Sequence, residues 1–187
     1  QAGADPAEFT CTATRDGDEW VINGEKWFAS HARFSEFLLV MVVTNPDVPI
    51  HEGASIILVE KGTPGMEILR NSAVGPYVEQ GDGVHGYLRF TDCRVPAENL
   101  LGEEGQGFLV AQTRLGGGRV HHAMRSVGVL KKAMDMMCER VLSRTTKGER
   151  LADKQLTQEK IADTYTQILQ YRLHVLYTAW LIDKYKE

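Results

Sequence analysis

The first hundred residues contain short segments in which apolar residues either alternate with polar ones or follow one another, and both patterns are typical of β-strands. The apolar or alternating segments are 9–14, 20–22, 26–28, 37–43, 55–59, 66–69 and 84–90. Asn23-Gly24, between two of them, predicts a hairpin because both central residues of such a turn need positive φ. Phe37 to Val43 is apolar throughout and predicts a strand buried on both faces. Short strands separated by Gly and Pro favour an antiparallel β barrel or sandwich.

Beyond residue 100 the apolar positions recur every three or four residues, which predicts two long helices. The first is expected at 108–143, roughly 50 Å long at about 1.5 Å per residue. Its apolar face comprises Val120, Met124, Val127, Leu130, Met134, Met137 and Val141. The second is expected from about residue 155 to the end, with an apolar face of Ile161, Tyr165, Leu169, Leu173, Leu176 and Trp180. These faces are too long to be buried against one small barrel, so we expect further helices outside these residues.

The change of period divides the chain into an expected β domain at 1–102 and a helical domain at 103–187. Val95-Pro96 ends the strands, and a glycine-rich link follows. The predicted fold class is α+β multidomain, with an antiparallel β barrel or sandwich followed by long antiparallel helices of an incomplete four-helix bundle. The chain begins in loop-like residues and stops within a helical pattern, so we expect a piece of a longer protein.

Composition narrows the class of protein. Hydrophobic residues make up 43% and charged residues 25%, which excludes a disordered chain. A net charge of -4 disfavours nucleic acid as a partner, because phosphate binding needs a cationic surface. No apolar run approaches the ~20 residues of a membrane span. Cys11, Cys93 and Cys138 are few and far apart, which indicates neither a disulfide framework nor a metal site and favours a reducing compartment. We read no targeting leader.

Two segments carry residue types that suit a ligand. Trp27-Phe28-Ala29-Ser30 ends a predicted strand with aromatic rings beside a hydroxyl, which suits a flat heterocycle but also a protein core. Arg114, Arg119 and Arg125 surround the three glycines at 116–118. Bare backbone beside guanidinium groups suits close approach by an anionic or planar ligand. Tight helix packing beside solvated charges explains the same pattern equally well.

Two other patterns favour a structural interpretation. Gly102, Gly105 and Gly107 precede a helix, but their spacing matches neither a dinucleotide nor a Walker loop, so a flexible link is favoured. His121 and His122 are adjacent and therefore point to different helix faces. They lack a Cys or His pair at zinc spacing, so no metal is expected.

An ordered set of motifs resembles the acyl-CoA dehydrogenase family. The set comprises Ala2-Gly3-Ala4-Asp5, Val21 to Ser30, Thr63-Pro64-Gly65, Phe90 to Pro96, Asn99 to Gly102 and Gly105 to Phe108. Its order and spacing match across essentially the whole chain. Gly-Gly-Gly-Arg-Val-His-His at 116–122 resembles the branch that includes family members 10 and 11. The resemblance implies the family's middle β domain and the first two helices of its C-terminal bundle.

The resemblance also implies an activity. Family members are FAD-dependent oxidoreductases that oxidise an acyl-CoA thioester at its α and β carbons to the 2-enoyl-CoA, as in fatty acid β-oxidation. A carboxylate removes the α proton, FAD N5 receives the β hydride, and an electron-transferring flavoprotein takes the electrons. We therefore expect acyl-CoA and that flavoprotein as partners, and a homodimer or dimer of dimers. The expected location is the cytoplasm of a bacterium or the mitochondrial or peroxisomal matrix of a eukaryote.

By the same resemblance, the end of the Val21 to Ser30 motif forms the flavin site. Phe28 matches the aromatic residue beside the isoalloxazine, and Ser30 matches the hydroxyl that bonds to flavin N5. Trp27 and Ala29 match neighbours whose backbone lies along the ring. Ala4 stands where the family usually has Ser, in a loop along the flavin and the thioester end of CoA, so a hydroxyl contact is lost.

The residues that the resemblance implies for substrate binding lie mainly in the helical half of the chain. The resemblance places Gly116 and Arg119 along the acyl and CoA path. A minority branch of the family has its catalytic Glu at the position of Gly118. The base is therefore expected beyond Glu187, and residues 1–187 alone are expected to be inactive.

The segment between the two expected helices, 144–148, resembles the family motif Arg-x-x-Phe-Gly. In the family this Arg and a later Gln, here Gln155, reach the pyrophosphate and adenosine of the FAD of a neighbouring subunit. Lys147 replaces the Phe, which removes a ring contact at the adenosine end. The residues implied as cofactor ligands are Arg144, Thr145, Thr146 and Gln155.

Three functions remain open on the sequence. An acyl-CoA dehydrogenase is favoured over an acyl-CoA oxidase or a nitroalkane-oxidase-like enzyme of the same fold, and over a non-catalytic scaffold. Reaction of the reduced flavin with oxygen separates the first two. A carboxylate after Glu187 separates an enzyme from a scaffold. Acyl chain length and branching are not encoded in these residues.

Overall fold

The computed structural model describes residues 5–72 and 85–185. The strands are β1 (Thr12–Asp16), β2 (Glu19–Ser30), β3 (Phe37–Val43), β4 (Ala54–Glu60), β5 (Met66–Asn71), β6 (His85–Pro96), β7 (Thr145–Thr146) and β8 (Glu149–Arg150). The helices are α1 (Ile50–Gly53), α2 (Gly107–Ser143) and α3 (Gln155–Lys184), with 3₁₀ turns at Pro6–Glu8, Ala97–Asn99 and Leu151–Asp153. Ala4 and Glu187, named in the sequence analysis, lie outside the described residues.

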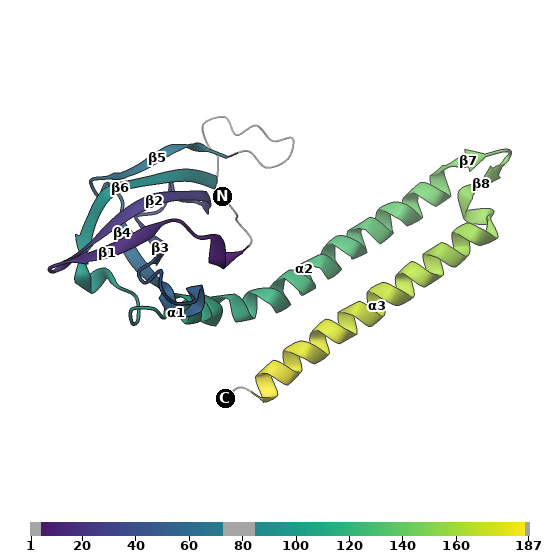
Figure 1. Ribbon diagram of the computed structural model, residues 1–187. Helices are drawn as coiled ribbons and strands as arrows, with labels where there is room; N and C mark the ends of the chain where they lie inside the picture. Colours follow the sequence, from purple (N-terminus) through teal and green to yellow (C-terminus); the bar gives the residue numbers. More distant parts are fainter. Residues whose placement is uncertain (1–4, 73–84, 186–187) are drawn as a thin grey trace. The chain divides into compact units, whose positions relative to one another are not determined.

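Packing divides the chain within α2, into a β unit (residues 1–113) and a helical unit (residues 114–187). The domain boundary expected between residues 102 and 103 stays a prediction. The predicted fold class is confirmed, with a sheet followed by long helices (Figure 1). The two predicted helices are confirmed as α2 and α3. None of the described helices is long and apolar enough to cross a membrane.

The strands of the β unit form one six-stranded sheet in the order β4-β3-β1-β2-β6-β5. Its pairs are antiparallel except β1 with β3, which share a single parallel pair, Thr12 with Val43. β4 and β5 end the order and do not pair with each other among the described strands, so the sheet is curved but not closed (Figure 1). The predicted barrel or sandwich is therefore an open, curved sheet among the described strands.

The hairpin predicted at Asn23-Gly24 is also wrong. The predicted strands 20–22 and 26–28 are one strand, β2, and the turn before it contains Gly17, with φ 61°. Gly24 has φ 131°, and a Cβ on it would lie 2.7 Å from Cys11 Cα. Glycine is thus needed there for the close approach of β1, which the sequence pattern does not distinguish from a turn.

β3 has the predicted bounds, but it is not buried on both faces. Its first half alternates, with Phe37 52% and Leu39 56% exposed, whereas Val40 and Val42 are buried. The inward face joins the core of the β unit, which comprises Cys11, Ala13, Trp20, Ile22, Ala32, Val40, Val42, Ile57, Val59, Leu88, Phe90, Cys93 and Val95. The outward apolar residues of β3 therefore lie outside that core.

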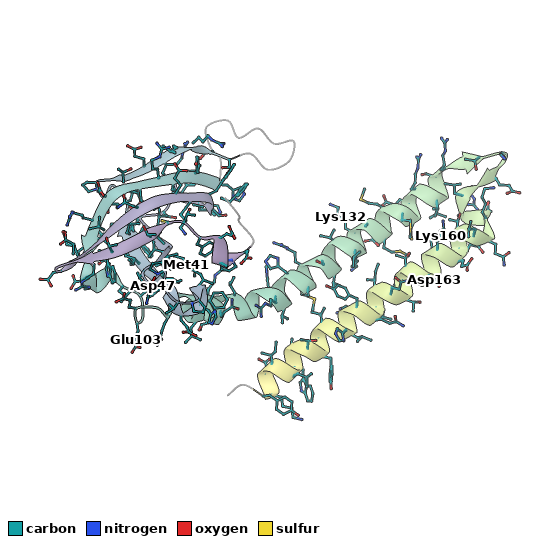
Figure 2. All side chains as sticks on the ribbon, viewed as in Figure 1. Met41, Asp47, Glu103, Lys132, Lys160 and Asp163 are labelled. Atoms are coloured by element: carbon teal, nitrogen blue, oxygen red, sulfur yellow. The ribbon has the colours of Figure 1, made fainter. Side chains whose placement is uncertain are left out.

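In the helical unit, α2 and α3 run antiparallel and are joined by the short β7–β8 hairpin (Figure 1). An apolar groove lies between them, lined by Met124, Val127, Gly128, Lys131, Met134, Asp135, Cys138, Tyr165, Ile168, Leu169 and Arg172. Val127 and Val141 of the predicted α2 face are buried. The predicted α3 face is instead largely exposed, and the buried residue of α3 is Val175, which is not among the residues predicted on that face. Charged side chains such as Lys132, Lys160 and Asp163 lie exposed along both helices (Figure 2).

Candidate functional site

The end of β2 carries a β-bulge that sets the geometry of the candidate flavin site. Between the pairs Lys26–Leu88 and Ala29–Gly86, β2 contributes Trp27 and Phe28 where β6 contributes only Tyr87. Phe28 takes up the extra residue with φ 57°. Successive residues of a regular strand point to opposite faces, and a bulge breaks that alternation. The rings of Trp27 and Phe28 therefore stack, with centroids 5.5 Å apart and planes 9° apart.

We call Trp27, Phe28 and Tyr87 the ring platform. Trp27 is 50% exposed and Phe28 is 53% exposed. The Tyr87 ring lies 5.4 Å from the Trp27 ring. The Arg70 guanidinium lies 5.5 Å from the Trp27 ring and 5.3 Å from the Tyr87 ring. Large aromatic rings left half in water are unfavourable unless a partner covers them. The platform thus presents a flat apolar surface that suits a planar heterocycle.

Hydrogen bonds hold two rings of the platform in place. Trp27 Nε1 donates to Ser72 Oγ, and Ser72 is buried. The Tyr87 hydroxyl donates to Glu25, which also accepts from Arg89 Nε at 2.9 Å. The hydrogen bond from Tyr87, and next that from Arg89, lower the pKa of Glu25, and the same Glu25 contact raises the pKa of Tyr87. Glu25 is therefore an anion at neutral pH and fixes the Tyr87 ring.

Ser30 lies beside the platform and has a partner on β6. Ser30 and His85 are directly paired in the sheet, and Ser30 Oγ lies 3.0 Å from His85 Nδ1. The His85 ring meets the Phe28 ring edge-on, with centroids 6.2 Å apart. Ala29 is half-buried against the core beneath them. The bulge thus brings a hydroxyl, an imidazole and two stacked rings to one strand end.

A groove of about 300 Å³ includes Ser30 in its lining. β1 lies between β2 and β3 in the sheet and pairs with β2 only as far as Asn23, so β1 does not fill the space between them beyond that point. The groove is lined by Lys26, Ala29, Ser30, Ser35, Phe37, Leu38, Leu39, Val40 and Leu88. Burial lowers the pKa of Lys26, whose ammonium lies 4.9 Å from the Phe9 ring centre. Ser30 is therefore reachable between two apolar surfaces.

The glycines predicted as a ligand site lie within α2 in the helical unit. Apart from the adjoining residues and the backbone of α2 itself, no described atom lies within 4 Å of a Cβ built on Gly116, Gly117 or Gly118. The helical unit holds Arg119 directly after them. A close neighbour among the described residues does not explain these glycines, and both the ligand site and the tight helix packing stay predictions.

The β7–β8 hairpin positions the second group of predicted cofactor ligands. Thr145 pairs with Arg150 and Thr146 with Glu149, and the turn between them has φ 52° at Lys147 and φ 81° at Gly148. Two successive positive φ angles are the requirement of the tight hairpin turn that the strand twist favours. Lys147 thus stands at the tip of the turn.

Ion pairs fix the base of this hairpin. Arg150 binds Asp153 at 3.0 Å, and Lys154 binds Glu149 at 3.2 Å. Leu151 N donates to Arg144 O at 2.8 Å, which closes the hairpin, and α3 begins at Gln155. Arg144, Thr145, Thr146 and Gln155 therefore lie in one compact segment of the helical unit.

The flexible link expected at Gly102, Gly105 and Gly107 is wrong in one respect, and the structural interpretation of His121 and His122 stays a prediction. The glycine link before α2 is anchored rather than flexible, because Gly105 N donates to Ser55 Oγ at 2.9 Å and a Cβ on Gly107 would lie 2.6 Å from Ser55 C. His122 Nδ1 lies 2.6 Å from an Arg125 guanidinium nitrogen. The described residues include no group of metal-ligating side chains.

Sequence reasoning missed His85, Ser72, Arg70 and Tyr87 as neighbours of the platform. Arg70 lies on β5, Ser72 directly follows that strand, and His85 and Tyr87 lie on β6. All are more than forty positions from Trp27, as the separation of 45 for Ser72 illustrates. The signal that finds them is the β2–β6 register, which a periodic pattern does not give.

Two family models match the chain. "Acyl-CoA dehydrogenase, middle domain" matches residues 1–93, and "Acyl-CoA dehydrogenase, C-terminal domain" matches residues 105–187. The chain therefore belongs to the acyl-CoA dehydrogenase family, as the motifs indicated.

Individual relatives agree with this assignment. "Probable acyl-CoA dehydrogenase FadE2" of Mycobacterium tuberculosis is 41% identical over 98% of this chain and 45% of its own length. "Acyl-CoA dehydrogenase family member 11" of Gallus gallus is 37% identical over 97% of this chain and 24% of its own length. The structure of an acyl-CoA dehydrogenase from Geobacillus kaustophilus is 32% identical, with a TM-score of 0.80, over 93% of this chain and 45% of that one. The chain thus spans less than half the length of each.

Proposed function

We propose that the protein is an FAD-dependent acyl-CoA dehydrogenase that converts an acyl-CoA thioester to the 2-enoyl-CoA. An electron-transferring flavoprotein is the proposed electron acceptor. The observation that carries the proposal is the half-exposed ring platform with the Ser30 hydroxyl beside it. The family of the chain supports the same function.

The residues present fit FAD. Trp27 and Phe28 offer a flat surface that is 50% and 53% exposed, and covering it with an isoalloxazine removes apolar area from water. Ser30 would hold the ring by a hydrogen bond at N5, and Ala29 contributes backbone beside it. The flavin, when bound, supplies an acceptor for the β hydride of the substrate. The protein's own part is therefore to orient a planar ring and to place one hydroxyl against it.

The β7–β8 hairpin would hold the other end of an FAD. The Arg144 guanidinium suits pyrophosphate because its planar fork binds two oxygens at once. Thr145, Thr146 and Gln155 add hydroxyl and amide groups for the same end. We propose that this end belongs to the FAD of a neighbouring subunit, so that a homodimer, alone or within a dimer of dimers, is needed to complete each site.

The acyl-CoA path is proposed to follow the bare backbone at Gly116 and the side chain of Arg119. Ala4 is proposed to contribute a backbone contact. Gly118 has no side chain and therefore cannot be the base that removes the α proton. A carboxylate after Glu187 is the proposed base, so the catalytic residue is outside this chain.

Anaerobic titration of the whole protein with acyl-CoA tests the function. We expect the flavin absorbance to bleach and the 2-enoyl-CoA to appear in equal amount, with rapid recovery on adding an electron-transferring flavoprotein. Rapid recovery with oxygen and release of hydrogen peroxide would indicate an oxidase instead. A flavin that acyl-CoA does not bleach would contradict the proposal.

Mixed subunits test the shared site. Ser30→Ala and Arg144→Ala subunits are each expected to be impaired, and a heterodimer of the two has one site with both lesions and one with neither. Activity should therefore recover on mixing. Arg150→Ala is the matched control for Arg144→Ala, because Arg150 is tied to Asp153 in the same hairpin. No recovery, with subunit exchange confirmed by mass spectrometry, would show that each subunit builds its own site.

A further inference from the structure

We propose that His85 is a positioning residue that decides whether the Ser30 hydroxyl offers a hydrogen or a lone pair to the group on the ring platform. The inference rests on the proposed function, in which that group is a flavin. It assigns a role to a residue that the motifs of the chain do not mark, and it stands on the contact between Ser30 Oγ and His85 Nδ1 at 3.0 Å.

Two backbone contacts and one ring contact hold His85 in place. Its backbone pairs with Ser30 in the β2–β6 ladder, and its carbonyl accepts from Ser72 N at 2.7 Å. Its ring meets Phe28 edge-on at 6.2 Å and an interplanar angle of 69°. Because Ser72 also accepts from Trp27 Nε1, one short segment ties His85 to both stacked rings of the platform. The Nδ1 atom is therefore fixed toward Ser30.

The chemistry of the two groups makes their hydrogens interdependent. A serine hydroxyl carries one hydrogen, and a neutral imidazole carries one on either Nδ1 or Nε2. When Nδ1 is bare, Ser30 donates to it and turns a lone pair toward the platform. When Nδ1 carries hydrogen, it donates to Ser30, whose own hydrogen is then available to the platform. The tautomer of His85 thus decides whether Ser30 presents a hydrogen or a lone pair to the ring platform.

This coupling matters because a flavin N5 accepts a hydrogen bond when oxidised and carries a hydrogen when reduced. While Ser30 is hydrogen-bonded to His85, it can donate to an oxidised N5 only when His85 Nδ1 carries hydrogen. When Nδ1 is bare, Ser30 donates to it and accepts from a reduced N5. The change of tautomer releases one proton from Nδ1 to solvent while Nε2 takes one from solvent, so the charge of His85 is unchanged. The half-exposed ring of His85 gives water access to that exchange. A side chain without this freedom favours one oxidation state over the other.

Two substitutions separate the hydrogen bond from the packing. His85→Phe keeps a ring against Phe28 and removes the partner of Ser30. His85→Asn loses the ring but places an amide, which can donate or accept, near the position of Nδ1. Each is made in the whole protein, alone and together with Ser30→Ala. The readout is the ratio of affinities for oxidised and reduced FAD, obtained from the midpoint potential, together with the side-chain ¹⁵N spectrum of His85.

We expect His85→Phe to change the affinity ratio by about tenfold, which equals about 30 mV for a two-electron couple. His85→Asn should restore most of that change. In the Ser30→Ala background, His85→Phe should change the ratio less than twofold, because the hydroxyl that it acts through is gone. Ser30→Ala should also shift the His85 Nδ1 resonance in the unmutated ring.

The contrary outcomes are distinct. If the wild type retains FAD and Ser30→Ala shifts the ratio, but His85→Phe does not, the inference is wrong while the proposed function stands. An equal effect of His85→Phe with and without Ser30 would assign His85 a packing role only, and would overturn the inference. A wild type that retains no FAD contradicts the proposed function and the inference together.

Discussion

The β unit and the helical unit treat their large apolar residues differently. Trp20 of the β unit is 2% exposed, whereas Trp180 of the helical unit is 51% exposed. In the β unit most of the exposed large apolar residues gather between positions 27 and 39, at the end of β2 and the start of β3. In the helical unit they recur along both helices. Exposure of large apolar residues is therefore informative in the β unit, where it coincides with the candidate site, and uninformative in the helical unit, where it is the rule.

The sharpest test of this comparison is one substitution made in both units. Trp20→Ala should lower the free energy of unfolding of the 187-residue chain by about 3–5 kcal/mol, because it leaves a cavity in a packed core. Trp180→Ala should lower it by less than about 1 kcal/mol, because its ring is half in solvent. Urea unfolding followed by circular dichroism measures both. Equal losses would show that the helical unit has a core comparable to that of the β unit.

The pH dependence of the free energy of unfolding tests whether water is excluded from the β core. Burial, with a smaller contribution from Cys11, raises the pKa of Cys93 to about 11. A thiol whose pKa is higher in the folded state stabilises the fold below its unfolded pKa, and this contribution is lost as pH rises toward 11. Relative to Cys93→Ala, the wild type should therefore lose about 2 kcal/mol between pH 8 and pH 11.

Parallel curves for the wild type and Cys93→Ala over this range would contradict that prediction. They would mean that the Cys93 thiol ionises in the folded protein as it does in the unfolded chain. Water would then reach the centre of the sheet, and the contrast between the two units would be weaker than the exposed fractions indicate.

The smallest expected effects are those of replacing a glycine by alanine, and their sign should differ between the two units. Gly24→Ala should destabilise the β unit by more than about 1 kcal/mol, because φ is 131° and the added Cβ meets Cys11 at 2.7 Å. Gly117→Ala should stabilise α2 by about 1 kcal/mol, because a helix interior favours Ala and nothing lies within 4 Å of the added Cβ. Thermal unfolding of the two variants checks the signs. Destabilisation by Gly117→Ala would indicate a contact at this glycine.

The sequence predicts whether a region forms helices or strands better than it predicts the turns between strands or the burial of their faces. The helical period extends over α2 and α3 and predicts both, because a long period tolerates local exceptions. Asn23-Gly24 misleads, since glycine serves a close approach of two strands as readily as a turn. The apolar run of β3 does not reveal that one face is uncovered at Phe37 and Leu39, because burial depends on which elements pack there.

The candidate site also combines features that the sequence predicts with features that it does not. Motifs that are contiguous in sequence, such as residues 27–30 and 144–148, are found from the sequence alone. The bulge that stacks Trp27 on Phe28 is not, because it arises from the register of β2 against β6. His85 becomes visible as the partner of Ser30 only through that register.

FAD retention tests the central claim, which is that a flavin covers the half-exposed ring platform. Phe28 and Phe34 are 53% and 57% exposed, but Phe34 packs near His31 and not on the platform. The measurement is the dissociation constant of FAD for the whole protein with Phe28→Ala or Phe34→Ala, from flavin fluorescence during dialysis. We predict that Phe28→Ala weakens FAD binding about tenfold or more and that Phe34→Ala changes it less than about twofold. Equal dissociation constants for the two variants and the wild type would contradict the account.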